Sequence, residues 1–102
     1  MTNHKKISEF IKSTLNQLDK TLDEESINSV NHYLDHNEYE MAFEGLFIEI
    51  MQLQSIPQID LIKAREIAED LNLNNESVFD FSFWNKFELF TLKHANINNT
   101  LG

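Results

Sequence analysis

The stretch from Asp35 to Leu53, DHNEYEMAFEGLFIEIMQL, most constrains the fold because its apolar residues have helical spacing. At 100° per residue, one arc about 100° wide holds six ring or aliphatic side chains. These are Tyr39, Ala42, Phe43, Leu46, Ile50 and Leu53. The pattern predicts a helix with one fully buried face, around which the rest of the chain packs.

The opposite side of this predicted helix is also apolar, and acids flank it. It carries Met41, Ile48 and Met51, between Glu40 and Glu44 on one flank and Glu38, Glu49 and Gln52 on the other. One interpretation is that another helix of the chain covers Met41 and Ile48, because apolar residues at helical spacing are usually core. The other is an exposed contact patch with an acidic rim. The sequence leaves both open.

Turn-forming residues are scarce, which bears on the fold class. The 102 residues include two Gly and one Pro, and 41% of them are hydrophobic. Since β-rich folds of this size need more turn residues, we predict an all-α fold, a compact bundle of four to five antiparallel helices. We expect a single helical domain over residues 1–95 and a flexible polar tail at 96–102.

Capping signals place the helix ends. We expect helices over about 3–18, from Asp23 as N-cap to His36–Asn37, over about 59–71, and over about 83–93. A short turn at Asn37 predicts a helical hairpin on either side of it. The segment before Phe83 is ambiguous, since its Phe residues fit both alternating and helical spacing. We predict an irregular entry into the last helix, with its aromatic residues locking the bundle.

The net charge of −9 is concentrated in one segment. Residues 21–62 hold nine of the 17 acids and no Lys or Arg, so the remaining residues are balanced, with eight acids and eight bases. Such a field repels nucleic acid and anionic membrane and attracts a basic surface. The alternative is a solvated face that only maintains solubility.

Without cysteine, a signal peptide or a membrane-length apolar run, we expect a cytoplasmic protein.

Catalytic signals are weak. His32 and His36 have the spacing of two metal ligands, with Asp35 or Glu38 as a third, but no H-E-x-x-H arrangement surrounds them. Acids four residues apart, such as Glu40 and Glu44, are common on exposed helix faces. The sequence therefore predicts no enzyme, no metal site and no cofactor, and a small metal-dependent hydrolase is kept only as a third hypothesis.

One family resemblance supplements these patterns. The segment LDEESINSVNHYLDHNEYEMAFEGLFIEI, then IDLIKAREIAEDLNL and the pair Phe83-Trp84, resembles the MafI-like immunity proteins of bacterial polymorphic toxin systems. The matching pattern is a helix ending in a Leu-Asp-His turn, a Glu-Tyr start, and Ala and Leu at Ala42 and Leu46. It covers roughly residues 22–87, with Asn37 where the family often has glycine.

The resemblance implies a helical protein that neutralises a cognate toxin domain, often a nuclease with a basic cleft. The acidic segment independently suits such a partner. We predict partner-binding residues on the outer side of the central helix and its preceding turn: Asp35, Glu38, Glu40, Met41, Glu44 and Ile48. Charge reversal at Glu40 and Glu44 is expected to leave melting nearly unchanged. The alternative function is a helical adaptor that docks a partner unrelated to toxins.

Overall fold

A computed structural model of the chain describes the backbone of residues 3–101 and the side chains of residues 3–94. This part of the chain contains five helices and no strand, as the all-α prediction requires. The helices are α1 (His4–Gln17), α2 (Glu24–Asp35), α3 (Tyr39–Ile50), α4 (Leu61–Asp70) and α5 (Phe83–Leu101).

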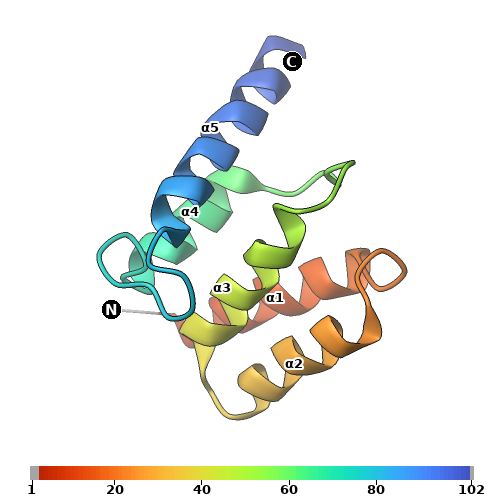
Figure 1. The fold of residues 1–102 in the computed structure, drawn as a ribbon, viewed down its shortest axis with the longest axis vertical. Coiled ribbons are helices and arrows are strands. Elements are labelled where there is room, and N and C mark those ends of the chain that lie inside the picture. The colour runs from red at the N-terminus through yellow and green to blue at the C-terminus, as the bar shows by residue number, and fades with distance from the viewer. Residues whose placement is uncertain (1–2, 102) are drawn as a thin grey trace.

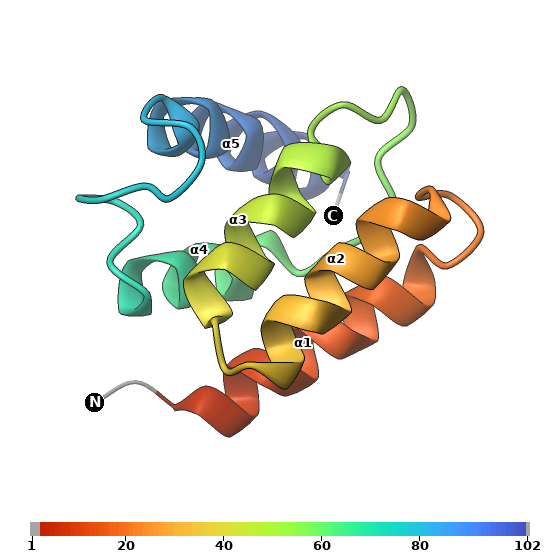
Figure 2. The ribbon, with the colours of Figure 1, turned by 60° about the horizontal axis from the view of Figure 1, so that its bottom comes forward.

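Helix α3 lies at the centre of the molecule. It contacts α1, α2 and α5, and α4 packs on α5. Figure 1 shows α3 between the α1–α2 pair and the α4–α5 pair, and Figure 2 shows the same arrangement from a second direction. The stretch with the strongest helical apolar pattern therefore forms the central helix, as predicted.

The local signals at the two ends of α2 act as predicted. Asp23 caps α2, since its side chain accepts the Ser26 N–H at 3.2 Å. Asn37 has φ of 58°, the left-handed conformation that Asn tolerates at a helix end. The Nδ1 atom of His36 lies 2.9 Å from the carbonyl oxygen of His32, so the imidazole partners a terminal helix carbonyl. Asp23 thus begins α2, and His36 and Asn37 end it, where the chain turns back along α2 as α3.

The core of the bundle is aromatic where α3 meets α5. Phe43, Phe47, Phe83 and Phe87 are fully buried. The ring centroids of Phe43 and Phe47 are 4.7 Å apart, and the Phe87 centroid lies 5.3 Å from that of Phe47 in an edge-on arrangement. Such ring pairs contribute about 0.5–1.5 kcal/mol beyond area burial. The predicted aromatic lock is therefore confirmed for Phe83 and Phe87, whereas Phe79 and Phe81, from the same predicted aromatic block, are exposed.

Two details of the predicted pattern differ. Tyr39 and Leu53, expected inside, are only partly buried, because they lie at and beyond the ends of α3. Phe47, which falls outside the predicted arc, is fully buried, because α3 is enclosed on more than one side.

The last helix also exceeds its predicted range. Its backbone continues past Lys93 to Leu101, through most of the polar tail predicted at 96–102. The side chains from residue 95 onward and Gly102 lie outside the described residues.

The overall dimensions agree with one folded unit. The radius of gyration is 12.9 Å, close to the roughly 13 Å expected for a folded chain of about 100 residues. Within the described residues, no helix combines the length and the apolar character needed to cross a membrane.

Candidate functional site

The six residues predicted to bind a partner do not share one exposed face. Asp35, at the end of α2, and Glu40, in the first turn of α3, are exposed. Glu38, Met41 and Ile48 are half-buried. The sixth, Glu44, is completely buried, so the predicted patch is divided between the surface and the interior.

The expectation that Glu44 projects into solvent is wrong. Its carboxylate accepts three consecutive backbone N–H groups from the segment before α5. The Oε1 atom lies 2.8 Å from the Val78 nitrogen, and Oε2 lies 2.7 Å and 2.9 Å from the nitrogens of Phe79 and Asp80. Consecutive N–H groups in a turn form a concave site for an anion, and here the anion is a side chain of the same protein.

The position of Glu44 on α3 explains this burial. Met41, Glu44 and Ile48 follow i, i+3, i+7 spacing and share one side of the helix. The loop before α5 and α5 itself lie over that side. Ile48 packs against the core. Together with Met51 it also borders a hollow whose other lining residues include Asp80, Lys86, Leu89 and Phe90. Ile48 is therefore partly covered by other parts of the chain and stays half-buried at the edge of this hollow.

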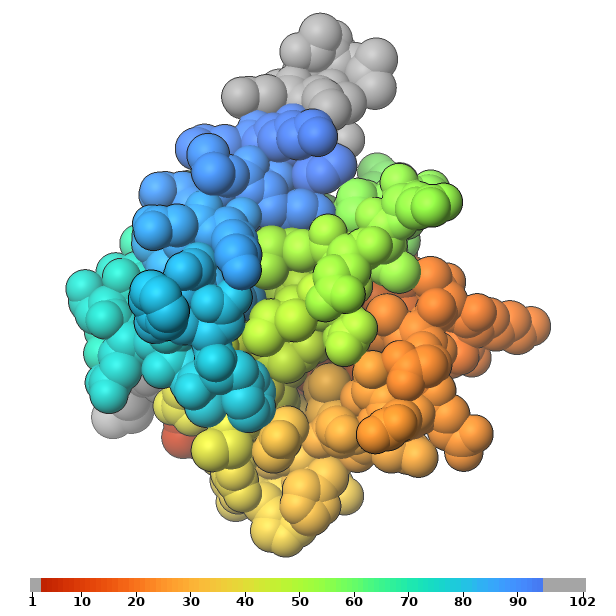
Figure 3. Space-filling model, in the orientation of Figure 1, coloured from red at the N-terminus to blue at the C-terminus, as the bar shows by residue number. Residues whose placement is uncertain are grey.

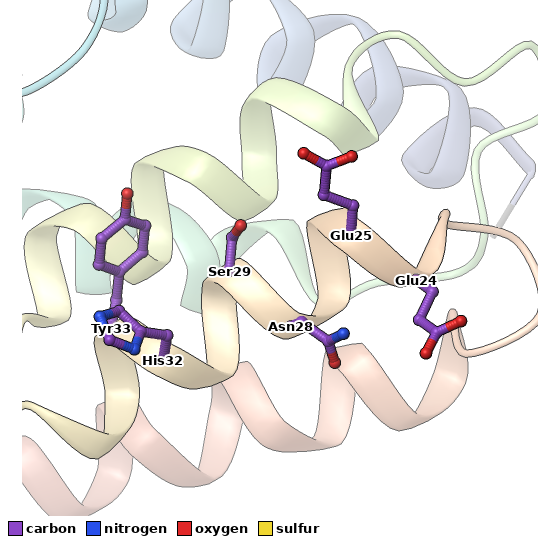
Figure 4. A pocket seen from close by; sticks show the side chains of 6 residues that line it. All are labelled: Glu24, Glu25, Asn28, Ser29, His32 and Tyr33. Carbon is purple, nitrogen blue, oxygen red and sulfur yellow. The ribbon is translucent and has the colours of Figure 1, made fainter.

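A different acidic surface lies between α2 and α3. A groove of about 430 Å³ runs there, lined by Asp23, Glu25, Ser26, Ser29, Val30, Tyr33, Gly45, Glu49 and Phe79. Three of its lining residues, Glu25, Ser29 and Tyr33, also border a neighbouring hollow along α2. Figure 4 shows these three side chains in one row on the side of α2 toward α3, with Glu24, Asn28 and His32 in a second row. The two hollows form one continuous surface.

The electrostatics of this groove are one-sided. Three acids line it, and no Lys or Arg is among its lining residues. The hydrogen bonds from the Ser26 hydroxyl and backbone N–H lower the pKa of Asp23 below its ordinary value and so favour its charged form. The groove, which we call the acidic groove, is therefore suited to cationic side chains.

Aromatic side chains close one side of the acidic groove. The ring centroids of Tyr33 and Phe79 lie 5.9 Å apart, so α2 and the loop before α5 meet across the groove. Gly45 of α3 lies beneath: a Cβ there would be 3.7 Å from Cε2 of Phe79, an ordinary contact distance. The absent side chain at Gly45 keeps this part of the groove open.

The side chains of His32 and His36 pack together at the C-terminal end of α2. The rings of His32 and His36 lie 4.4 Å apart between centroids, and one nitrogen of His36 faces the His32 carbonyl. Among the described residues, no group of three His, Cys, Asp or Glu side chains could hold a metal ion. The contacts of the pair are with each other and with the last turn of α2.

Comparison with protein-family models, with curated proteins and with solved structures finds no match for this chain. The similarity to the MafI-like immunity proteins consequently stays a prediction.

Several groove residues were not predicted from the sequence. Glu25, Ser29 and Tyr33 have i, i+4, i+8 spacing, which could have marked a polar stripe on α2. Gly45 is one of two glycines and sits within a strongly apolar helix, which is a signal of close approach or open space. No local pattern, however, indicated that Phe79 would reach across to α2.

Proposed function

We propose that this protein is an immunity protein that binds and neutralises a cognate bacterial toxin domain through its acidic groove. The observation that supports this proposal best is the groove itself, where Asp23, Glu25 and Glu49 line a surface with no Lys or Arg. A toxin that binds nucleic acid has a basic cleft, and such a cleft complements this surface.

The mechanism in this proposal is occlusion of the toxin, with no reaction catalysed by the immunity protein. Acidic side chains steer the toxin toward the groove and raise the association rate. Once bound, they occupy the positions that phosphates of the toxin's substrate would take.

The test uses the protein encoded immediately upstream of this chain. We expect the two to copurify on co-expression, and the wild-type chain to restore growth of cells that express the toxin. The double variant Glu25→Lys, Glu49→Lys should associate about tenfold more slowly at low salt, because like charges would then face each other.

A matched control is available on the other helices. Glu9 on α1 and Glu66 on α4 are exposed and lie outside the acidic segment. The Glu9→Lys, Glu66→Lys variant changes net charge by the same amount and should bind like the wild type. If both variants associate more slowly by the same factor, only net charge matters. If the protein that binds is instead a regulator or a metabolic enzyme, the adaptor function is favoured.

A further inference from the structure

The loop before α5 exposes aromatic side chains to an unusual degree. We call residues 76–82 the aromatic loop. Phe81 is 94% exposed and Phe79 is 51% exposed, whereas Phe43, Phe47, Phe83 and Phe87 have no exposed surface. Leaving a Phe ring exposed forgoes about 1.5–3 kcal/mol of burial energy, which contact with a partner would recover.

The backbone of the aromatic loop is fixed despite this exposure. The buried Glu44 carboxylate holds the N–H groups of three successive loop residues. Asp80 adds two bonds, accepting the Ser82 N–H at 2.9 Å and pairing with Lys86 at 2.8 Å. A loop tied at these points has its backbone conformation set before any partner arrives, which reduces the entropy cost of docking.

The aromatic loop and the acidic groove are adjacent. Phe79 belongs to both, since it lines the groove together with Glu49 and packs near Tyr33. In Figure 3 the cyan surface of the loop lies against the yellow-green surface of α3, on the face where α2, in orange, is also exposed. The exposed aromatic side chains of the loop therefore lie next to the acidic groove.

We propose that the aromatic loop is the apolar anchor of a docking surface for a basic protein. Phe81 enters an apolar pocket of the partner, while Arg or Lys side chains flanking that pocket enter the acidic groove. This inference rests on the proposed function and deepens it, because it locates the contact and adds an aromatic hot spot to the electrostatic attraction. Charge complementarity identifies the partner's chemistry, since the groove has acids and no bases.

The first arm of the test needs no knowledge of the natural partner. The probe is a short synthetic peptide that alternates arginine with leucine, titrated into the full-length protein and followed by backbone amide NMR. We expect shift changes in residues 76–82 and in the lining of the acidic groove. Matched peptides with serine in place of leucine, or glutamate in place of arginine, should bind at least about tenfold more weakly.

The variant that decides the proposal is Phe81→Ala. Its ring is almost wholly exposed, so melting should not change, while affinity for the arginine–leucine peptide should fall about tenfold or more. The control is Ile62→Ala on α4, an exposed apolar side chain remote in sequence, which should retain wild-type affinity. Unchanged affinity in Phe81→Ala, or absence of peptide binding to the wild type, would overturn the proposal.

The second arm uses the upstream-encoded protein. Phe81→Ala should raise its dissociation rate about tenfold while the salt dependence of association stays as in the wild type, because the acids are intact. If the wild-type chain does not bind that protein, the proposed function fails, and the peptide arm still decides the role of the loop. Two results would point to a different occupant and overturn the proposal. They are self-association of the wild type, or its binding to phosphatidylcholine vesicles, if Phe81→Ala abolishes either one.

Discussion

At the scale of single residues, Glu44 shows how far the environment of a side chain can depart from its sequence pattern. It sits among acids in an acidic segment, yet its carboxylate is fully buried against three backbone N–H groups. A buried carboxylate is tolerable because charge-assisted hydrogen bonds replace its hydration. Its chemistry is therefore that of a structural anchor, and the expected neutrality of charge reversal does not extend to it.

We predict that Glu44→Ala lowers the free energy of unfolding by about 1.5–3 kcal/mol, because three N–H groups lose a charged acceptor. Glu44→Gln should also destabilise the fold, since its amide oxygen can accept but its NH₂ group would face a backbone N–H donor. Urea denaturation measures both. The control is Glu40→Gln, an exposed neighbour that should stay within about ±0.5 kcal/mol of wild type, and equal stability of all three variants would contradict the anchor role.

Gly45 provides a second residue-scale prediction. Gly45→Ala should stabilise the protein by about 0.4–1 kcal/mol, because alanine restricts the unfolded chain and is a better helix former. Its Cβ would meet Phe79 at an ordinary contact distance, so no repacking is needed. A thermal melt tests this, and a lower melting temperature would show that α3 or the aromatic loop must shift to admit the methyl group.

The pKa of Asp80 leads to a prediction for acid stability. The hydrogen bond from Lys86, then that from the Ser82 N–H, lowers this pKa below its ordinary value of 3.8. A lowered folded-state pKa contributes stability above the unfolded value that is lost as pH falls through the folded value. Wild type should therefore be more stable than Lys86→Met at neutral pH, and the gap should shrink as pH falls below 3.8. Thermal melts across this pH range measure the stability difference between the two proteins. If that difference does not change with pH, the ion pair is not its cause.

At the scale of elements, α3 is the helix on which the others depend. Its buried side chains face α1, α2 and α5, which pack around it. Because several neighbours share this one helix, a void in it weakens several contacts at once. The α2–α3 hairpin also forms the acidic groove, so the same helix serves both the core and the surface.

We predict that Phe43→Ala destabilises the fold by about 3–5 kcal/mol, through lost burial and the cavity that remains. Phe43 is fully buried and its ring lies 4.7 Å from Phe47 and 5.7 Å from Phe87 between centroids. Chemical denaturation monitored by circular dichroism gives the value. Leu89→Ala, at a side chain 69% exposed on α5, is the matched control and should remain near wild type.

At the scale of the whole molecule, the unequal distribution of charge is the dominant property. The excess of nine negative charges falls within residues 21–62, which include α2 and α3, while the rest of the chain is balanced. The arrangement gives the molecule an acidic side that acts over roughly a Debye length, about 10 Å at 0.1 M salt. This long-range attraction complements the short-range contacts of the aromatic loop.

The corresponding prediction concerns ionic strength. Raising salt to about 0.5 M should slow association with a basic partner markedly and change dissociation much less, because screening acts on the encounter step. Stopped-flow or surface-binding kinetics with the upstream-encoded protein measure both rates. An association rate independent of salt would show that the acidic side contributes to solubility alone.

Local sequence patterns were sufficient to predict the helical class, the central position of α3, and most helix ends. Those features depend on short-range physics: apolar spacing selects the buried face, Asp23 caps one helix, and Asn37 tolerates the turn. The aromatic spacing after Phe83 likewise predicted a helix that locks the core. Each of these signals is contained within a few neighbouring residues, so no knowledge of distant contacts was needed.

The acids that are available to a partner, by contrast, are selected by the tertiary fold alone. Glu44 and Glu40 have the same side chain and lie one turn apart, yet one is buried and the other exposed. The difference arises because the segment at residues 78–80, more than thirty positions later in the chain, folds over one side of α3. The acidic groove depends in the same way on Phe79 reaching Tyr33. Burial and groove formation depend on contacts between distant segments, and helical periodicity contains no information about them.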